Sequence, residues 1–330
     1  MSTAESGKVS GRTSIAESDD VSPQSLPVDL DSTRSLQARP RRSRNLRSSR
    51  AARDAARELK RGSGRRIDTP VRKAFVRPMT SGRDVAPLSL IYKGRGGDVA
   101  VKLYLAILWR CATAPWTTSA PARAWATLLD LDDPENAGAR RIRNALRALE
   151  AAQLVTVAST PGSPNTISIL DESGSGDQYR LPSTAYAKKQ RAGASKSELA
   201  EDMYFKFPTK LWTSGNVQHM SGSAIVMLLI LLAEQGGDGS PVWFSTNEFP
   251  RRYSISANSR AAGTAELQQL ELLEVKSEPL PDPGTRRTPT FKTRRRRKVY
   301  TLTRRAQIDE PNPEVSASGP PRRRRVAVKK

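Results

Sequence analysis

The chain of 330 residues contains a single cysteine, Cys111, and a single histidine, His219. One cysteine excludes an internal disulfide and every metal site built from several cysteines. Together with the lone histidine, it removes most zinc, iron and catalytic-triad chemistry. No paired carboxylates and no nucleophile beside a base stand out in the sequence. We therefore expect neither an enzyme nor a metal or other cofactor.

Long apolar runs are also lacking. The longest, residues 224–233, is too short to span a bilayer. The first residues, MSTAE, do not show the charged-then-apolar pattern of a signal peptide, so export is not expected. These features predict a cytoplasmic protein, associated with the nucleoid and without a membrane partner.

Two apparent motifs fail on their spacing. The acidic stretch 130–137 (DLDDPENA) lacks the glycine and the spacing of a calcium loop. The segment 94–97 (GRGG) lacks the phosphate-loop pattern and the Lys-Ser/Thr that would follow it. The tryptophans occupy core-like positions and are expected to pack rather than to stack on bases: Trp109, Trp116, Trp125, Trp212 and Trp243.

The net charge of +22 is unevenly distributed. Residues 34–77 hold 16 Lys and Arg against 3 Asp and Glu, and residues 286–330 hold the same numbers. Residues 1–33 hold 2 against 6, and residues 78–285 hold 21 of each sign. Basic flanks attract any polyanion and bind phosphates without regard to base sequence. DNA is the favoured partner of these flanks, and RNA and an anionic membrane surface are left as alternatives.

The composition divides the chain into five parts. Residues 1–85 are poor in large apolar side chains and read as disordered, as do residues 304–330. Within the first part, residues 48–60 (SSRAARDAARELK) form either a helix on nucleic acid or a solvated arm. Residues 173–201 read as a linker between two modules, 86–172 and 202–303.

Both modules show the same predicted order of helix, short strand, two helices and a strand hairpin. In the first module these elements are expected at 98–112, 115–118, 119–129, 138–153, 154–157 and 166–170. In the second they are expected at 221–234, 242–245, 246–252, 257–270, 273–276 and 298–303. The segments 148–157 and 266–275 align at a separation of 118 residues, which indicates a duplication.

This order resembles that of winged helix-turn-helix domains, chiefly over residues 98–170. The resemblance implies an α+β chain, mainly α with small β-hairpins, with two tandem winged-helix domains between disordered basic tails. Tandem winged helices joined by a linker are similar to the replication initiators of bacterial plasmids. In those proteins the modules read repeats at an origin, and one module can mediate dimerisation. The Arg- and Ala-rich composition looks like that of a GC-rich actinobacterial genome.

The helix predicted at 138–153 is the best candidate for reading DNA. Its apolar side chains fall on one face, and a cationic face lies opposite at i, i+3, i+4 and i+7 spacing. The predicted DNA-binding residues here are Arg140, Arg143, Asn144 and Arg147, with Arg141 at the margin. Arginine pairs well with guanine and asparagine with adenine in the major groove. The alternative is an ordinary solvated helix face.

The second module is weaker at the corresponding helix, which is as consistent with a dimer contact as with DNA binding. Its candidates are Arg251, Arg252, Asn258, Ser259 and Arg260, although Arg260 points partly inward in this prediction. Its wing is strongly basic, with candidates Arg294, Arg295, Arg296, Arg297 and Lys298. Such a run suits a narrow minor groove or the phosphates, the alternative being a solvated loop.

These features favour sequence-specific binding of double-stranded DNA, as a replication initiator of a plasmid or mobile element that binds origin repeats. The expected partners are double-stranded DNA, the replication machinery and a second copy of the chain. Two alternatives stay open. One is a transcriptional regulator with winged-helix domains, and the other is a nucleoid-associated or RNA-binding scaffold that acts through its basic tails.

Overall fold

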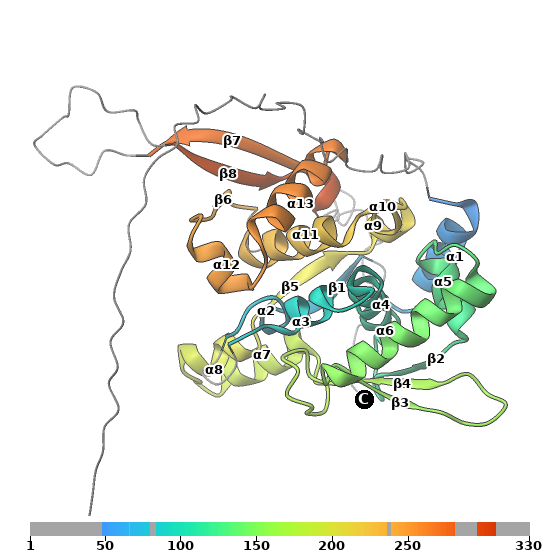
Figure 1. Cartoon of the computed structure of the whole chain (residues 1–330). Coiled ribbons are helices and arrows are strands. Elements are labelled where there is room, and N and C mark those ends of the chain that lie inside the picture. Colours follow the sequence, from blue (N-terminus) through green and yellow to red (C-terminus); the bar gives the residue numbers. More distant parts are fainter. Residues whose placement is uncertain (1–47, 66, 80–83, 236–238, 281–295, 308–330) are drawn as a thin grey trace, which may run out of the picture. The chain divides into compact units, whose positions relative to one another are not determined.

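The computed structural model describes residues 48–65, 67–79, 84–235, 239–280 and 296–307, which all belong to one structural unit, residues 45–330 (Figure 1). They form helices and small antiparallel sheets, which confirms the expected α+β class. The disorder predicted for residues 1–47 and 308–330 lies outside the described residues. Within the described part of the chain, no helix has the length and apolar character needed to cross a membrane.

The first half of the fold follows the predicted order of elements. They are α4 (Gly97–Arg110), β2 (Thr117–Ser119), α5 (Ala122–Leu128), the π-helix η1 (Pro134–Gly138), α6 (Ala139–Ala151), β3 (Val155–Ala158) and β4 (Thr166–Ile169). The three strands form an antiparallel sheet in the order β2-β4-β3. Val155 lies opposite Ile169 in the predicted hairpin, and both are buried, so the hairpin is anchored in the core.

The second half repeats this arrangement. Its elements are α11 (Gly222–Gln235), β6 (Val242–Trp243), α12 (Glu248–Tyr253), α13 (Ala257–Gln269), β7 (Leu273–Pro279) and β8 (Arg296–Leu302). Its sheet has the corresponding order, β6-β8-β7, and is again antiparallel. Leu273 lies opposite Leu302 and Val275 opposite Tyr300. The equal sheet order in both halves supports the predicted duplication.

Side-chain caps fix where the last helix of each half begins. Asp133 accepts hydrogen bonds from the N–H groups of Asn136 and Ala137, at 3.3 and 3.1 Å, at the start of η1, which continues into α6. The bond from Ala137, followed by those from Asn136, lowers the pKa of the Asp133 carboxyl. Ser256 Oγ accepts from the N–H of Ser259 at 3.1 Å at the start of α13. Both caps satisfy amides that a helix start leaves without partners.

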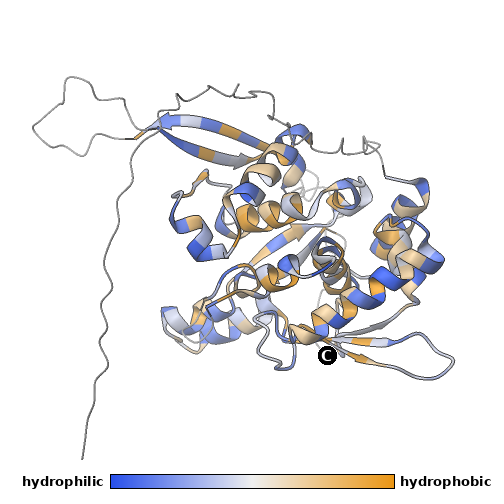
Figure 2. Cartoon of the chain, in the orientation of Figure 1, coloured by the Kyte–Doolittle hydropathy of each residue, from blue (hydrophilic) through white to orange (hydrophobic). Residues whose placement is uncertain are grey.

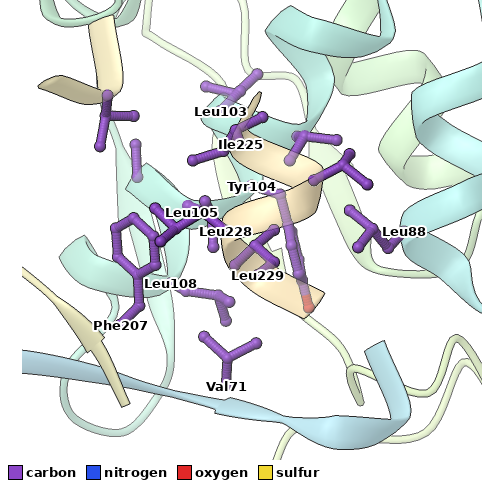
Figure 3. Close-up of a cluster of buried hydrophobic side chains, with 14 of the residues drawn as sticks. Val71, Leu88, Leu103, Tyr104, Leu105, Leu108, Phe207, Ile225, Leu228 and Leu229 are labelled. Atoms are coloured by element: carbon purple, nitrogen blue, oxygen red, sulfur yellow. The ribbon is translucent and has the colours of Figure 1, made fainter. Parts of the chain in front are cut away.

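The two halves share one hydrophobic core. The central helices α4 and α11 pack against each other, and Figure 3 shows Leu105 and Leu108 of α4 with Leu228 and Leu229 of α11 in one buried cluster. Burial of each such side chain is worth about 1.5–3 kcal/mol relative to exposure. The expectation of two separate domains joined by a linker is therefore not what the structure shows, because the interface between the halves is itself core.

Part of the expected N-terminal arm is ordered. Helix α1 (Arg50–Gly62) packs against α5 and buries Ala52 and Ala56. Strand β1 (Asp68–Arg72) pairs antiparallel with β5 (Tyr204–Pro208). The prediction of disorder up to residue 85 is wrong for these segments. The average composition of this segment is polar, which is why it was expected to be disordered. Two alanines four residues apart on one face of the helix are nevertheless sufficient for close packing against α5.

The predicted linker is also ordered in large part. It contains α7 (Pro182–Arg191), which packs against β1, and α8 (Lys196–Glu201). Ser195 and Glu198 form a reciprocal capping box at the start of α8. The remaining elements are α2 (Lys73–Val76), α3 (Pro87–Lys93), α9 (Lys210–Thr213), α10 (Asn216–His219) and the short helix η2 (Arg304–Ala306).

Strand β1 ends in Arg72, whose side chain is buried among carboxylates. Its Nη1 donates to Glu172 Oε2 at 2.8 Å, and its Nη2 donates to Asp202 Oδ1 at 3.1 Å and to the carbonyl of Arg180 at 2.7 Å. Burial opposes the charge of Arg72, but Glu172 and then Asp171 outweigh it and raise the pKa of the guanidinium. One side chain therefore ties β1 to the end of the first half and to the connecting segment.

Candidate nucleic-acid interface

Helix α6 separates its residues into a buried face and an exposed cationic face, and its ribbon alternates in hydropathy along its length (Figure 2). The predicted apolar face is confirmed as buried: Ile142, Ala145, Leu146 and Leu149. The predicted polar residues are all exposed: Arg140, Arg141, Arg143, Asn144 and Arg147. The burial pattern follows the helical period, since residues three and four apart share a face.

Two contacts distinguish the arginines of α6 from one another. Arg147 Nη1 donates to Asn144 Oδ1 at 3.1 Å, which aligns a guanidinium with an amide on the exposed face. Arg141 Nη2 lies 3.9 Å from Asp98 Oδ2 in the first turn of α4, so part of its charge is compensated. Arg140 and Arg143 are also exposed on α6.

An open groove of about 510 Å³ lies between α6 and the start of α4. Its lining residues are Arg95, Gly96, Val99, Arg141, Asn144, Ala145, Arg147 and Ala148. The groove therefore combines guanidinium groups of α6 with a further arginine, Arg95, from the turn between α3 and α4. The sequence prediction did not include Arg95.

Helix α13 is not equivalent to α6. Arg260, a predicted DNA-binding residue, turns inward: its guanidinium lies 4.7 Å from the ring centroid of Phe249 and 5.4 Å from that of Phe244. Its Nη2 also donates to Tyr300 Oη at 2.9 Å. Arg260 is thus half-buried in an aromatic cluster, and its role as a DNA contact stays a prediction. The negative faces of the neighbouring aromatic rings attract the guanidinium cation.

The other predicted residues of this region are distributed unevenly. Ser259 is half-buried, and Tyr92 Oη donates a hydrogen bond to Ser259 Oγ at 3.3 Å, which joins α3 to α13. Asn258 is exposed at the start of α13. Arg251 and Arg252 are exposed on α12, and Arg251 Nη1 lies 2.9 Å from Glu248 Oε1. Exposed ion pairs of this kind contribute at most about 1 kcal/mol to stability, so Arg251 can exchange Glu248 for another anion with little loss of free energy.

The hairpin of β7 and β8 presents part of the predicted basic wing. Arg296 is exposed, and its Nη2 donates to the carbonyl of Ser277 on β7 at 2.7 Å. Lys298 is exposed two residues further along β8. Arg294 and Arg295 lie outside the described residues. The described part of β8 thus carries cations on a strand that is held by pairing with β7.

Trp243 is the exception among the tryptophans expected to pack. Its side chain is 53% exposed on β6, next to β8. The guanidinium carbon of Arg297 lies 5.4 Å from the ring centroid, and Arg297 Nη2 lies 3.5 Å from Glu278 Oε2. The expectation of packing is wrong here because β6 is a two-residue edge strand, and nothing in the described chain covers its outer side.

Within the described part of the chain, no group of three or more His, Cys, Asp or Glu side chains is placed to hold a metal ion. The predicted residues that are exposed offer guanidinium and amide hydrogen-bond donors on two separate elements of the fold, α6 and the β7–β8 hairpin.

No protein-family model, curated protein or solved structure matches this chain. The arrangement of its own residues is therefore the basis for assigning a function.

Sequence reasoning placed the face of α6 well but missed the groove beside it. A local signal existed, because Arg95 stands between glycines in a segment with no helical period. The segment lacks the phosphate-loop pattern, so no motif marks Arg95 as a binding residue. What brings Arg95 to α6 is the packing of α4 against α6, a contact between residues about 45 positions apart that no local pattern reveals.

Proposed function

We propose that this protein binds double-stranded DNA sequence-specifically through two winged-helix modules, α4 to β4 and α11 to β8, with α6 as the principal reading helix. The observation that carries the proposal is the exposed Arg/Asn face of α6, the last helix before a strand hairpin. In a winged helix this helix enters the major groove. The repeated order of elements and the repeated sheet order support the same reading of the second half.

The dimensions of α6 suit this role. Arg140 and Arg147 are seven residues apart, so their backbone positions are separated by about 10.5 Å along the axis. That length corresponds to about three base-pair steps of B-DNA, at about 3.4 Å each. Arg143 and Asn144 lie between them. A good bidentate contact from arginine to guanine or from asparagine to adenine discriminates by about 1–3 kcal/mol against a wrong base.

The second module makes a different contribution in this proposal. Because Arg260 is engaged with aromatic rings and Ser259 with Tyr92, α13 presents fewer donors than α6. The cations of this half lie on the β7–β8 hairpin and on α12. The hairpin then serves as a basic wing on phosphates or in a minor groove. A contact between two copies of the chain through α13 is the alternative role of this helix.

For the biological role, we propose origin binding by a replication initiator of a plasmid or mobile element, acting in the cytoplasm at the nucleoid. A transcriptional regulator is the second role, and the two share the same binding chemistry. A genetic test separates them. A plasmid without its own origin, carrying this gene with its flanking DNA, should replicate in a suitable bacterial host if the protein is an initiator. Failure to replicate, with altered transcription of a neighbouring promoter, would favour the regulator.

The binding proposal is tested by selecting a preferred duplex from a random pool with the full chain. Fluorescence anisotropy then gives the affinity for this duplex and for a scrambled one at two salt concentrations. Arg143→Ala and Asn144→Ala should each reduce the preference for the selected duplex by about 5- to 150-fold. Arg191→Ala, an exposed arginine on α7, is the matched control and should leave the preference unchanged.

Three outcomes count against the proposal. Equal affinity of the wild-type chain for selected and scrambled duplexes would indicate a scaffold that binds through its charge alone. Tighter binding to RNA than to any duplex would move the target from DNA to RNA. Loss of affinity without loss of preference in Arg143→Ala and Asn144→Ala would remove base reading from α6.

A further inference from the structure

Arg95 and Arg141 line the groove between α6 and the α3–α4 turn, and base reading by α6 assigns neither of them a role. We propose that this groove holds a backbone phosphate of the bound duplex, and that Arg95 is a DNA-binding residue whose guanidinium binds that phosphate. The inference rests on the proposed function, because it takes α6 to lie in the major groove. It adds a positioning contact that reads no base.

The turn is built to project Arg95. Gly97 begins α4 so close to the preceding chain that a Cβ at this position would lie 2.1 Å from the carbonyl oxygen of Tyr92. Gly96 has φ +77°, in the left-handed region that favours glycine. The chain therefore reverses within a very short segment, and Arg95 stands exposed at its tip.

The backbone of the turn is also open towards the groove. A Cβ at Gly96 would meet no atom within 4 Å, although Gly96 is a lining residue. A ligand can therefore approach the main chain here without meeting a side chain, which is one of the uses of glycine. The neighbouring first turn of α4 adds the partial positive charge of a helix start. This effect supports the cations and does not replace them.

The charge of the groove fits an anion. Arg95, Arg141 and Arg147 line it from two elements, and Asn144 adds an amide. The nearby carboxylate of Asp98 lies 3.9 Å from Arg141 and compensates one of these charges in part. Guanidinium groups match the geometry of phosphate oxygens and can donate two hydrogen bonds at once.

The position of the groove fits a DNA strand. A helix with its side chains is about 10–12 Å across, and the major groove is about 12 Å wide, so the helix fills it. The phosphates that border the major groove must then run along the flanks of α6. One flank is the groove itself, lined by Arg141, Asn144 and Ala148. Its volume of about 510 Å³ far exceeds the roughly 30 Å³ of one liquid water, so there is room for a phosphate with its sugar.

The test compares Arg95→Ala with Lys93→Ala in the full chain. Lys93 is an exposed cation two residues away that does not line the groove, so it controls for the loss of one charge. Each variant is titrated with the selected and the scrambled duplex over a series of salt concentrations. Thermal unfolding of both variants should match that of the wild type, because both side chains are exposed.

Arg95→Ala should weaken binding to both duplexes by the same factor, about three- to tenfold at low salt. It should also reduce the slope of log affinity against log salt by about 0.9, the value for one phosphate contact. Lys93→Ala should change affinity less than twofold. In a second measurement, duplexes with single uncharged methylphosphonate links should include one link that weakens wild-type binding but has no further effect on Arg95→Ala.

The result that overturns the inference is an Arg95→Ala variant with the affinity and salt slope of Lys93→Ala. A change of base preference in Arg95→Ala would also overturn it, since it would make Arg95 a base-reading residue. Failure of the proposed function is distinguished from failure of the phosphate site by the Arg143→Ala variant. If Arg143→Ala leaves base preference unchanged, α6 does not read bases, whatever the effect of Arg95. If Arg143→Ala reduces the preference while Arg95→Ala matches its control, only the phosphate site fails.

Discussion

Replacement of Arg72 by methionine should be among the most damaging single changes in this chain. The side chain is 1% exposed, and its partners Glu172 and Asp202 are 0% and 2% exposed. Methionine retains most of the aliphatic volume, so the substitution removes the charge and the hydrogen bonds while it leaves a small cavity. Two buried carboxylates would then lose the guanidinium that neutralises them.

The expected loss is about 3–5 kcal/mol, the range for breaking a buried ion pair by removing one partner. Total stabilities of domains are about 5–15 kcal/mol, so the loss is a large fraction of the whole. It should be greatest at about pH 8, where the carboxylates are ionised, and smaller at about pH 5. At the lower pH Glu172 can take up a proton and no longer needs a counter-charge.

The assay is urea unfolding followed by circular dichroism at both pH values. Lys206→Ala is the matched control, because Lys206 lies on β5 beside β1 and its Nζ is 3.6 Å from Asp68 Oδ2, but its side chain is 54% exposed. Its loss should stay below about 1 kcal/mol. Adding Glu172→Gln to Arg72→Met should restore part of the stability. Equal losses in Arg72→Met and Lys206→Ala, or a loss independent of pH, would refute the reasoning.

Three further predictions concern other parts of the fold. Burial raises the pKa of Glu172 from 4.5 to about 7, so between these pH values the folded chain holds a proton that the unfolded chain releases. The free energy of unfolding should therefore fall as the pH rises from 4.5 to about 7. A Glu172→Gln variant that retains this fall would contradict the assignment. At Gly263 a Cβ would lie 2.2 Å from the carbonyl oxygen of Ser223, so Gly263→Ala should destabilise by about 2–3 kcal/mol in urea unfolding, whereas the exposed Ala262→Ser should change stability by less than about 0.5 kcal/mol. Arg260→Ala should cost about 1–2 kcal/mol of stability and leave base preference in the anisotropy assay intact, and a loss of preference at unchanged stability would return Arg260 to the DNA-binding residues.

The parts of the fold that were predictable from sequence are those with a strong local period. The face of α6 follows from apolar residues at helical spacing, and Ile142 and Leu149 are buried as expected. The hairpin of β3 and β4 follows from alternation on either side of a Pro/Gly turn. In these cases neighbours along the chain and neighbours in space are the same residues, so the local pattern contains the answer.

The parts that were not predictable depend on distant partners. Arg72 resembles the other cations of the basic flank in sequence. Its burial depends on contacts with Glu172 and Asp202, which lie 100 and 130 residues further along the chain. Arg260 was expected to point partly inward, but its partner Tyr300 on β8, 40 residues further along, could not be named from the local sequence. Trp243 was predicted to pack because its position in the sequence is core-like, but β6 is a two-residue strand at the edge of its sheet. In each case tertiary packing overrides the meaning of the local sequence.

The pairing of β1 with β5 has a consequence for synthesis of the chain. Asp202, a partner of Arg72, emerges from the ribosome 130 residues after it. At about 5–20 residues per second, β1 waits for about 7–26 s before Asp202 and the strand partner β5 exist. The first half cannot complete its core during that time, since α4 has yet to meet α11. A product that stops between the two halves should therefore be a substrate for proteases rather than a small DNA-binding protein in its own right.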